Sequence, residues 1–516
     1  MPRRQVARPE KANSKTWRIV GWVFGLLSNS RLVTVFNLPL AVVTGWLLWR
    51  SLGWPLVGDA TIFHLIAGQM KMGAVPYRDI IDINMPLTYD IHAAVVAIGG
   101  MSDVAWRVFD LTAAAVMSAL ILSLVGPAGR AVAILAMLAV LAAHLLHSPY
   151  AAGQRDFLMS IPAVAAALVS ARAAEDHKRR WLYLLLAGAF TMTAASIKPS
   201  GILLLFLPAL ATRLHWREMI LIVVGAAGVA FLVFGQGGLG AFVTSVPELL
   251  PLYASIRGGA RSVPAILTAV AWMAPIGGLA VAAALGIAAP KPPRVRVIIG
   301  LTAFGMIHLL AQRKGWTYHF YPLAVGLACW GAWTLAALPT WRAFMCLIVI
   351  ASGLGWLRPD SFPRFENDAA PRASLAMQSA LESRLPRGAR VQMLDSDSGA
   401  FLAMARAGMR QATPHIQWFS LLFAKDSGRR EFLAALEADP PAAILLTNDQ
   451  WPNGQGFEAA DNWPEFMALL TSHYDLNLTG HEDYILWRFY LRRAPASNAP
   501  AVKQEAEEDW GKRGRR

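Results

Sequence analysis

The feature that most constrains this chain is a series of apolar runs, several of them long enough to cross a lipid bilayer. A membrane-spanning helix needs about 20 mostly apolar residues, and the first such run covers 33–53. Ten more runs follow it, at 104–126, 131–148, 157–173, 181–196, 200–213, 218–234, 264–288, 297–312, 319–337 and 341–357. The sequence therefore predicts a polytopic α-helical membrane protein with about eleven spans. The two short runs beside Lys198-Pro199 form either two crossings or one bent hairpin.

Composition supports this class and argues against a soluble nucleic-acid-binding protein. Of the 516 residues, 55% are hydrophobic and 16% are charged, whereas charged residues make up about 25% of a typical soluble protein. Many of the Lys and Arg residues behind the net charge of +14 lie between apolar runs, where they are typical of topology signals. Cys329 and Cys346 lie inside predicted spans and indicate no disulfide framework.

The apolar segment 86–100 decides which loops face the cytoplasm. The basic residues 1–32 are interpreted as a cytoplasmic tail, so the first span places Asp59 outside. If 86–100 crossed the membrane, several basic clusters would lie outside, against the usual charge bias. These clusters are 172–180, 213–217 and 291–296. We therefore expect 86–100 to be a juxtamembrane helix on the outer surface, within a first external loop, 54–103, and we expect the C-terminus to lie outside as well.

From Arg358 onward the sequence reads as ordinary soluble protein, so the membrane part is expected over 33–357. Helix-like and strand-like segments alternate, which predicts a C-terminal extracytoplasmic α/β domain over 358–493. The predicted helices are 374–385, 428–439 and 462–473, and the predicted strands are 391–394, 443–446 and 484–490. The tail 494–516 is rich in Ala, Pro and charged residues and is predicted to be disordered.

Two carboxylates occupy similar positions at the predicted outer ends of helices. Asp59 follows Gly58 ahead of a helix expected at 61–71, and Asp156 precedes the span at 157–173. Each one alone is explained by helix capping. Together they indicate a catalytic site, because a charge beside hydrocarbon is costly without a role. A partly desolvated carboxylate such as Asp59 is a candidate general base.

The same topology gathers further polar and aromatic residues on the outer face. Several cations there would lie at headgroup depth, which suits a phosphate or diphosphate on a lipid. The aromatic residues are typical of an interfacial belt, with sugar stacking as the alternative. The candidate substrate-binding residues are Tyr77, Arg78, Asp79, Asp82, Gln154, Arg155, Lys198, Arg313, Lys314, Trp316, Tyr318 and His319. A divalent metal is left open, because His64 and His319 could join the acids although no tight ligand spacing supports a site.

These residues resemble the GT-C superfamily of polyprenyl-phosphate-sugar-dependent glycosyltransferases, and more closely the bacterial relatives of protein O-mannosyltransferases and of the lipid A aminoarabinose transferase. Asp59, then Gly73-Ala74-Val75-Pro76-Tyr77-Arg78-Asp79, then Pro86-Leu87-Thr88-Tyr89 is similar to that family's first periplasmic loop, which carries a catalytic acid. Gly153-Gln154-Arg155-Asp156 is similar to the start of its second loop, and 312–319 to a late periplasmic segment. Ala60 stands where many members carry a second acid.

The resemblance implies transfer of a sugar from a polyprenyl-phosphate carrier to a lipid, glycan or protein acceptor on the periplasmic face, by single displacement with inversion. Asp59 would accept the proton of the acceptor, and Asp156 would orient the acceptor or balance charge. The cations would stabilise the departing lipid phosphate. A flippase or transporter of a lipid-linked or anionic solute is the alternative, and a polymerase or ligase of surface polysaccharide is a third reading. Transport sites usually lie near mid-membrane, so polar residues gathered on one face favour an enzyme.

Overall fold

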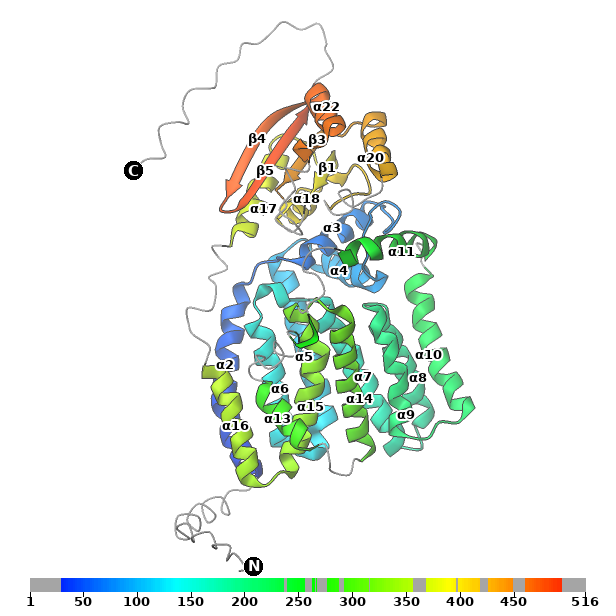
Figure 1. Ribbon diagram of the computed structural model, residues 1–516, viewed down its shortest axis with the longest axis vertical. Coiled ribbons are helices and arrows are strands. Elements are labelled where there is room, and N and C mark those ends of the chain that lie inside the picture. Colours follow the sequence, from blue (N-terminus) through cyan, green and yellow to red (C-terminus); the bar gives the residue numbers. More distant parts are fainter. Residues whose placement is uncertain are drawn as a thin grey trace, which may run out of the picture.

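The computed structural model of the chain has a helical bundle at one end and an α/β part at the other (Figure 1). The structure describes residues 29–235, 239–255, 262–264, 266, 276–286, 292–314, 316–355, 368–395, 398–417, 426–448 and 460–493. The terminal segments 1–28 and 494–516, which include most of the predicted basic tail and the predicted disordered tail, lie outside the described residues. The predicted class, a polytopic helical protein with a C-terminal α/β domain, is confirmed.

Most bundle helices follow the apolar runs closely, whereas residues 265, 267–275 and 287–288 of the predicted span 264–288 lie outside the described residues. They are α2 (Asn29–Arg50), α5 (Asp103–Val125), α6 (Arg130–Leu146), α7 (Arg155–Glu175), α8 (Arg180–Ala195), α9 (Leu207–Ala211), α10 (Trp216–Phe234), α13 (Gly277–Leu285), α14 (Pro293–Gln312), α15 (Tyr321–Ala337) and α16 (Thr340–Gly355). Within the described ranges, six helices are long and apolar enough to cross a membrane, and other runs form shorter apolar helices. Length and composition therefore do not establish the expected number of spans.

The second of the two short runs beside Lys198-Pro199 contains an unusual helix. The 3-10 helix η4 (Pro199–Phe206) follows α8 and continues into α9. A 3-10 stretch of eight residues is uncommon, since such runs rarely exceed about four residues. Lys198 is the N-cap residue of η4, three residues after the end of α8, and its side chain is 8% exposed.

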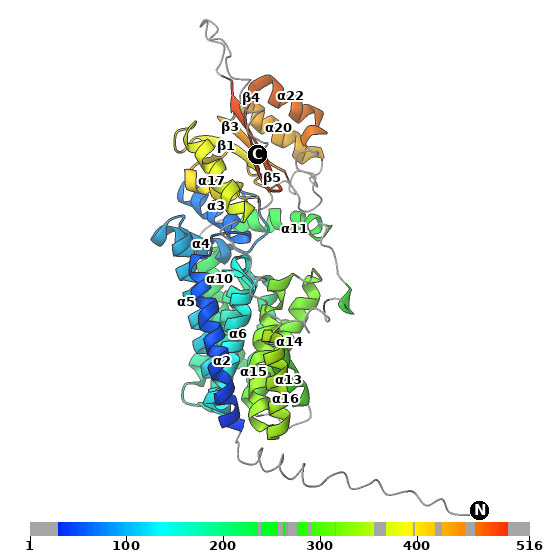
Figure 2. The ribbon, with the colours of Figure 1, turned by 90° about the vertical axis from the view of Figure 1, so that its left-hand side faces the viewer.

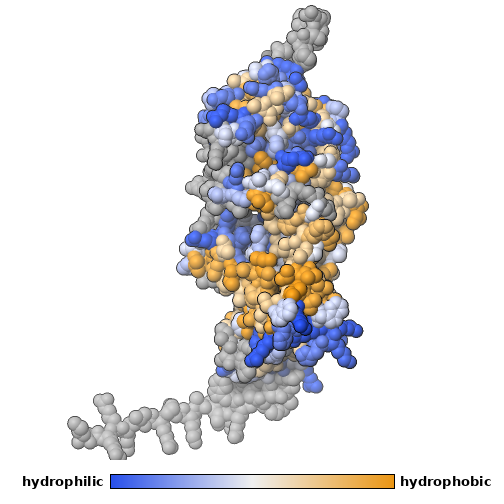
Figure 3. All heavy atoms as spheres, turned by 90° about the vertical axis from the view of Figure 1, so that its right-hand side faces the viewer, coloured by the Kyte–Doolittle hydropathy of each residue, from blue (hydrophilic) through white to orange (hydrophobic). Residues whose placement is uncertain are grey.

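The outer surface of the bundle is apolar. Figure 3 shows hydrophobic side chains gathered on the helical part, between the hydrophilic C-terminal end and a hydrophilic cluster at the opposite end. Within α10, Phe231 is 76% exposed and Val223 is 63% exposed. Large apolar side chains turned outward along a whole helix are suited to lipid and not to water.

The segment from Trp54 to Asp103 begins and ends at the same end of the bundle. The backbone N–H of Leu56 donates a hydrogen bond of 2.7 Å to the carboxylate of Asp103, which begins α5. Between them lie α3 (Asp59–Lys71) and α4 (Pro86–Gly99), in a layer between the bundle and the C-terminal part (Figures 1 and 2). The helix α11 (Leu239–Ser255), which the sequence had not led us to expect, lies in this layer as well.

The C-terminal part is one mixed sheet of five strands in the order β2-β1-β3-β5-β4. The strands are β1 (Arg390–Leu394), β2 (Arg410–Gln411), β3 (Ala443–Thr447), β4 (Tyr474–Glu482) and β5 (Ile485–Arg492), and the helices are α17 (Ala369–Glu382), α18 (Ala400–Ala407), α20 (Asp426–Ala438) and α22 (Pro464–His473). Alternate residues of β3 face opposite cores: Leu445 packs with α17 and α18, whereas Ile444 packs with α20 and α22. The sequence analysis missed β2, β4 and α18.

The α3 helix is anchored to the C-terminal part, and this fixes the orientation of its first turn. Phe63 and Ile66 belong to the same buried cluster as Met377 of α17. The buried amide of Gln69 donates to the backbone oxygen of Met409 at 2.8 Å and accepts from the N–H of Gln411 at 3.0 Å. A satisfied buried amide gives this docking a specific register.

Candidate active site

Asp59 lies in the first turn of α3, with its carboxylate turned towards α7. Gly58, at a φ of 65°, is the N-cap residue and supplies no side-chain cap. The Asp59 side chain is 29% exposed and accepts a hydrogen bond of 3.2 Å from Nη2 of Arg155, which begins α7. The acid therefore does not act as the capping residue, and it pairs with a cation from another helix instead.

Asp156 occupies the corresponding turn of α7 and is fully buried. Its Oδ2 lies 2.8 Å from Nζ of Lys198, and its Oδ1 lies 2.6 Å from Nε2 of His308 on α14. The other ring nitrogen of His308 lies 2.7 Å from the hydroxyl of Ser200. Because a buried carboxylate is costly without partners, this set of contacts accounts for the burial of Asp156. Asp156 is not a capping residue either.

Aromatic rings flank the two lysines of the site. Nζ of Lys198 lies 6.0 Å from the ring centre of Tyr318, and Nζ of Lys314 lies 5.0 Å from that of Trp316. The His319 ring contacts both aromatic rings: it is tilted relative to Trp316, with ring centres 5.4 Å apart, and edge-on to Tyr318, with ring centres 4.7 Å apart. Cations over ring faces are attracted by the ring quadrupole.

The lysine of the loop between α14 and α15 is electrostatically coupled to this group. Burial, together with the positive charges of Lys198 and Arg155, lowers the pKa of Lys314 to about 8. Three cations are therefore close enough to repel one another. Such a concentration of positive charge is suited to an anionic ligand.

A buried polar cluster below the site supports the loop that carries Arg155. The Asp110 carboxylate forms an ion pair with Arg107, contacts Nε2 of His144 at 3.1 Å and accepts from the backbone N–H of Gly153 at 2.8 Å. Nδ1 of His144 lies 2.8 Å from the hydroxyl of Tyr321. The Asp110 carboxylate joins α5, α6 and the loop before α7, and His144 extends this network to α15. These contacts fix the start of α7 relative to α5, α6 and α15.

Gly153 is required by the geometry of this loop. Its φ is 62°, and a Cβ at this position would lie 1.9 Å from Cζ2 of Trp106. The indole of Trp106 is 2% exposed, so it cannot swing into solvent. A larger residue would displace either the ring or the adjacent Gln154 and Arg155.

The predicted residues of the first loop hold the loop itself together. The buried carboxylate of Asp82 accepts hydrogen bonds of 2.7 Å from Tyr89 and from Asn84, and the hydroxyl of Tyr77 donates to the backbone oxygen of Asn84 at 2.5 Å. Burial raises the pKa of Asp82 despite these hydrogen bonds. The ring of Tyr77, at a φ of 68°, packs on Phe242 of α11.

Arg78 and Asp79 form an ion pair of 2.7 Å on the surface, with side chains 64% and 36% exposed. The Asp79 carboxylate also accepts from the backbone N–H of Val75 at 2.8 Å, and the guanidinium of Arg78 lowers the pKa of that carboxyl. Among the described residues, no ion pair joins Arg78 or Asp79 to Asp59, Arg155 or Asp156. The pair closes the turn between α3 and α4.

The remaining predicted residues lie at helix ends. Gln154 is the N-cap residue of α7, is 6% exposed, and donates to the backbone oxygen of Tyr150 at 2.9 Å. Arg313 is exposed and ends α14 with a left-handed φ of 53°. The structure thus brings together one group of the predicted residues: Asp59, Arg155, Asp156, Lys198, Lys314, Trp316, Tyr318 and His319.

Sequence reasoning missed His308, Asp110, Arg107 and His144. All four are ionisable residues inside apolar runs. Ionisable residues at such positions usually have a function or an ion-pair partner, so this signal in the sequence could have identified them. His64, a candidate metal ligand in the sequence, is a buried residue of α3 with Nδ1 2.9 Å from Nδ1 of His92, and burial lowers its pKa to about 4. In the part of the chain that the structure describes, no group of three or more His, Cys, Asp or Glu side chains could hold a metal ion.

Known proteins resemble this chain in structure and not in sequence. No protein-family profile and no curated protein matches the sequence. The structure of ArnT from Cupriavidus metallidurans bound to undecaprenyl phosphate has a TM-score of 0.57 and 12% identity, covering 88% of this chain and 98% of that chain. Its apo structure gives the same score and identity and covers 92% of this chain and 98% of that one.

A weaker match is the Archaeoglobus fulgidus oligosaccharyltransferase tethered with an acceptor peptide. Its TM-score is 0.48 at 11% identity, covering 90% of this chain and 74% of that chain. The two ArnT structures confirm the predicted resemblance to the GT-C superfamily at the level of the fold. At 12% identity they show the fold alone.

Proposed function

We propose that this chain, which has the fold of the GT-C glycosyltransferases, transfers a sugar from a polyprenyl-phosphate carrier to a hydroxyl acceptor by single displacement with inversion. The observation that supports this best is the contrast between the two acids. Asp156 is fully buried and held between Lys198 and His308, whereas Asp59 is 29% exposed and pairs with Arg155. Asp59 is the carboxylate that a substrate can reach.

In this scheme Asp59 is the general base. The acceptor hydroxyl oxygen forms a bond to the anomeric carbon while the bond from that carbon to the phosphate oxygen breaks. The electron pair of the broken bond leaves with the lipid phosphate, and the hydroxyl proton passes to the carboxylate of Asp59. The hydrogen bond from Arg155 holds the carboxylate of Asp59 in position before the transfer.

The cations near Asp59 are suited to the leaving group. Lys198 has three N–H donors, so its contact with Asp156 leaves donors for a phosphate oxygen. Arg155, Lys198 and Lys314 together surround a region where a developing phosphate charge would be stabilised without reorganisation of solvent. Trp316, Tyr318 and His319 offer flat surfaces for the sugar ring or for the first isoprene units.

The lipid carrier is supported by the comparison and by the position of the site. The ArnT neighbour was crystallised with undecaprenyl phosphate. In this chain the site lies where α7 and α15 begin and α14 ends, at one end of helices of membrane-spanning length. A carrier could keep its polyprenyl chain in the membrane and present its phosphate to these cations.

We place this end, together with the C-terminal domain, on the periplasmic side of the bacterial inner membrane, in keeping with the basic clusters at the opposite end. The acceptor would be a lipid, a glycan or a protein.

The test is mass spectrometry of lipids and surface glycans from a deletion strain, complemented with wild-type protein or with Asp59→Asn. We expect one modified species to disappear on deletion, to return with the wild type and not with Asp59→Asn, while the lipid-linked sugar accumulates on the periplasmic side. Accumulation on the cytoplasmic side would support the alternative, a flippase or transporter of a lipid-linked solute. Unchanged glycans in both strains would refute the transferase.

A further inference from the structure

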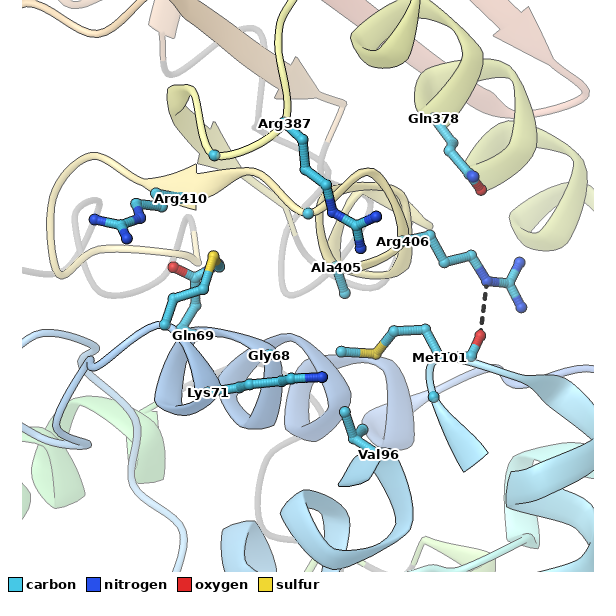
Figure 4. Close-up of a pocket in the computed structure, with 14 residues that line it drawn as sticks. Gly68, Gln69, Lys71, Val96, Met101, Gln378, Arg387, Ala405, Arg406 and Arg410 are labelled. Atoms are coloured by element: carbon cyan, nitrogen blue, oxygen red, sulfur yellow. Dashed lines mark hydrogen bonds between the residues drawn. The ribbon is translucent and has the colours of Figure 1, made fainter. Parts of the chain in front are cut away.

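A second positively charged site lies between α3, α4 and the C-terminal part. A pocket of about 720 Å³ opens there, lined by four cations and by no Asp or Glu. These cations are Lys71 of α3 and Arg387, Arg406 and Arg410 of the C-terminal part. Figure 4 shows Lys71 extending along α3 while Arg387 points down towards it from the opposite wall. The volume falls within the range of about 300–1,000 Å³ that is usual for small-ligand sites.

Three of these cations lack a carboxylate partner. Arg406 donates to Asp103 at 2.9 Å and to the backbone oxygen of Met101 at 3.2 Å, so its charge is matched. Among the residues that the structure describes, Lys71, Arg387 and Arg410 form no ion pair with an acid. Like charges on facing walls repel each other, and a bound anion would remove that repulsion.

The pocket lies at the depth of lipid headgroups. Val96 and Met101 line it, and α5, a helix of membrane-spanning length and composition, begins two residues after Met101. The apolar neighbours of these residues face outward: Ile98 is 90% exposed and Val104 is 69% exposed. Cations in a pocket whose wall continues in sequence into exposed apolar residues match an amphiphile with an anionic head and hydrocarbon chains.

This pocket is separate from the candidate active site. Asp59 and Lys71 lie at opposite ends of the 13-residue helix α3, roughly 18 Å apart at 1.5 Å per residue. The lining residues include none of the residues assigned to the transfer reaction.

We propose that this pocket binds the phosphate-bearing headgroup of an anionic membrane lipid, whose acyl chains lie along Ile98 and Val104. The lipid would bridge α3 and α4 to the C-terminal part, in addition to the hydrogen bonds of Gln69. Because it binds both walls, it would stabilise their docked arrangement. The proposal is independent of the transfer reaction.

The test is native mass spectrometry of the full chain in detergent, titrated with phosphatidylglycerol, with phosphatidylcholine or with inorganic phosphate. We compare the wild type with Lys71→Gln/Arg387→Gln and with the matched control Lys178→Gln/Arg430→Gln, which removes one exposed lysine and one exposed arginine elsewhere. Because each cation near a membrane strengthens the binding of anionic lipid, the pocket variant, which lacks two of them, should bind phosphatidylglycerol at least roughly tenfold more weakly than wild type or control.

The charge-conserving variant Lys71→Arg/Arg387→Lys guards against a folding artefact, because it should retain binding. Each variant is also checked by thermal unfolding, and phosphatidylglycerol should raise the unfolding temperature of the wild type more than that of the pocket variant. Equal phosphatidylglycerol binding by the wild type and the pocket variant would overturn the proposal. So would equal binding of phosphatidylcholine, or full displacement of the lipid by inorganic phosphate, which would identify a site for a free anion.

Discussion

The guanidinium of Arg155 lies 3.2 Å from the carboxylate of Asp59, across 96 residues of sequence. This contact joins the first turn of α3 to the first turn of α7. The next residue, Asp156, turns the other way and meets Lys198 and His308. Two consecutive residues in the first turn of α7 therefore belong to two different groups of charges. Arg155 pairs with the accessible acid, Asp59, whereas Asp156 is itself the buried acid. The following predictions separate the roles of the two acids.

Asp59→Asn should abolish most transfer without loss of the fold. The amide cannot accept the acceptor proton, so we expect kcat to fall by about 10²–10⁴ while donor binding persists. The measurement is turnover of a lipid-linked donor by the purified protein in proteoliposomes. Asp79→Asn, which alters the exposed pair with Arg78, is the control and should keep near-normal turnover. Normal turnover by Asp59→Asn would exclude Asp59 as the base.

The Asp156 and Lys198 pair should behave as a buried couple. Removal of one partner leaves an uncompensated buried charge, which costs about 3–5 kcal/mol. Asp156→Asn and Lys198→Met should each lower the thermal stability strongly, whereas the double variant should lose less than the sum of the two. Thermal unfolding in detergent measures this coupling, with the surface pair Arg78→Gln/Asp79→Asn as a control that changes little. Additive losses would show that the two side chains do not interact.

Lys198 should also contribute to donor binding, because its ammonium group faces the proposed phosphate position. Lys198→Ala should weaken binding of the lipid-linked donor more than Lys178→Ala does, since Lys178 is an exposed residue at the opposite end of α7 and α8. Donor affinity can be measured by titration of the purified proteins. Equal effects of the two substitutions would remove Lys198 from the phosphate site.

Donor capture should weaken as the pH rises through about 8. Burial holds the pKa of Lys314 at about 8, so the side chain is a cation below this pH and neutral above it. If the cation binds the donor phosphate, kcat/KM for the donor should fall roughly tenfold or more on the alkaline side. Lys314→Arg keeps its charge at every accessible pH and should flatten the profile. A profile that is the same for both proteins would contradict a role for Lys314.

Gly153→Ala should damage the protein far more than Gly73→Ala. Both glycines have positive φ, 62° and 96°, but a Cβ at Gly153 would meet Trp106 whereas one at Gly73 meets nothing within 4 Å. The backbone strain costs about 1–2 kcal/mol at either site, and overpacking adds about 1–3 kcal/mol at Gly153. Thermal unfolding reports the difference, and turnover should fall with Gly153→Ala because Arg155 moves. Similar losses for the two variants would show that Trp106 yields to the added methyl group.

Much of the fold could be read from local sequence, and much of the site could not. Most apolar runs predicted the bundle helices within a few residues, because the preference for lipid is a property of each residue. The exceptions are the run 200–213, which forms η4 and α9, and the run 264–288, of which α13 is the described helix. The strand β2 has two residues and the helix α18 has eight, so both are too short for periodicity to reveal. The helix α11 contains Pro247 and Pro251, which argue against a helix in local sequence. Its contact with Tyr77 exists only in three dimensions.

The candidate site shows the same difference between what local sequence predicts and what only tertiary contacts decide. Asp59, Asp156 and the cations could be selected from sequence because they are charged residues beside apolar runs. Their individual roles could not be predicted from sequence, because each role depends on contacts with residues that lie far away along the chain. Tyr77 and Asp82 were selected in the same way, and only the structure shows that their side chains form hydrogen bonds with Asn84 and Tyr89 of the same loop.

By itself the sequence determined that this chain is a polytopic membrane protein with its unusual charges near helix ends. The tertiary structure alone decided that His308, 152 residues away, would meet Asp156, and that Asp59 would remain accessible. Hydrophobicity is a property of each residue and its neighbours along the chain, whereas the state of a charge in a low dielectric depends on which other charges lie within a few ångströms. That proximity is created by the packing of α3, α7 and α14.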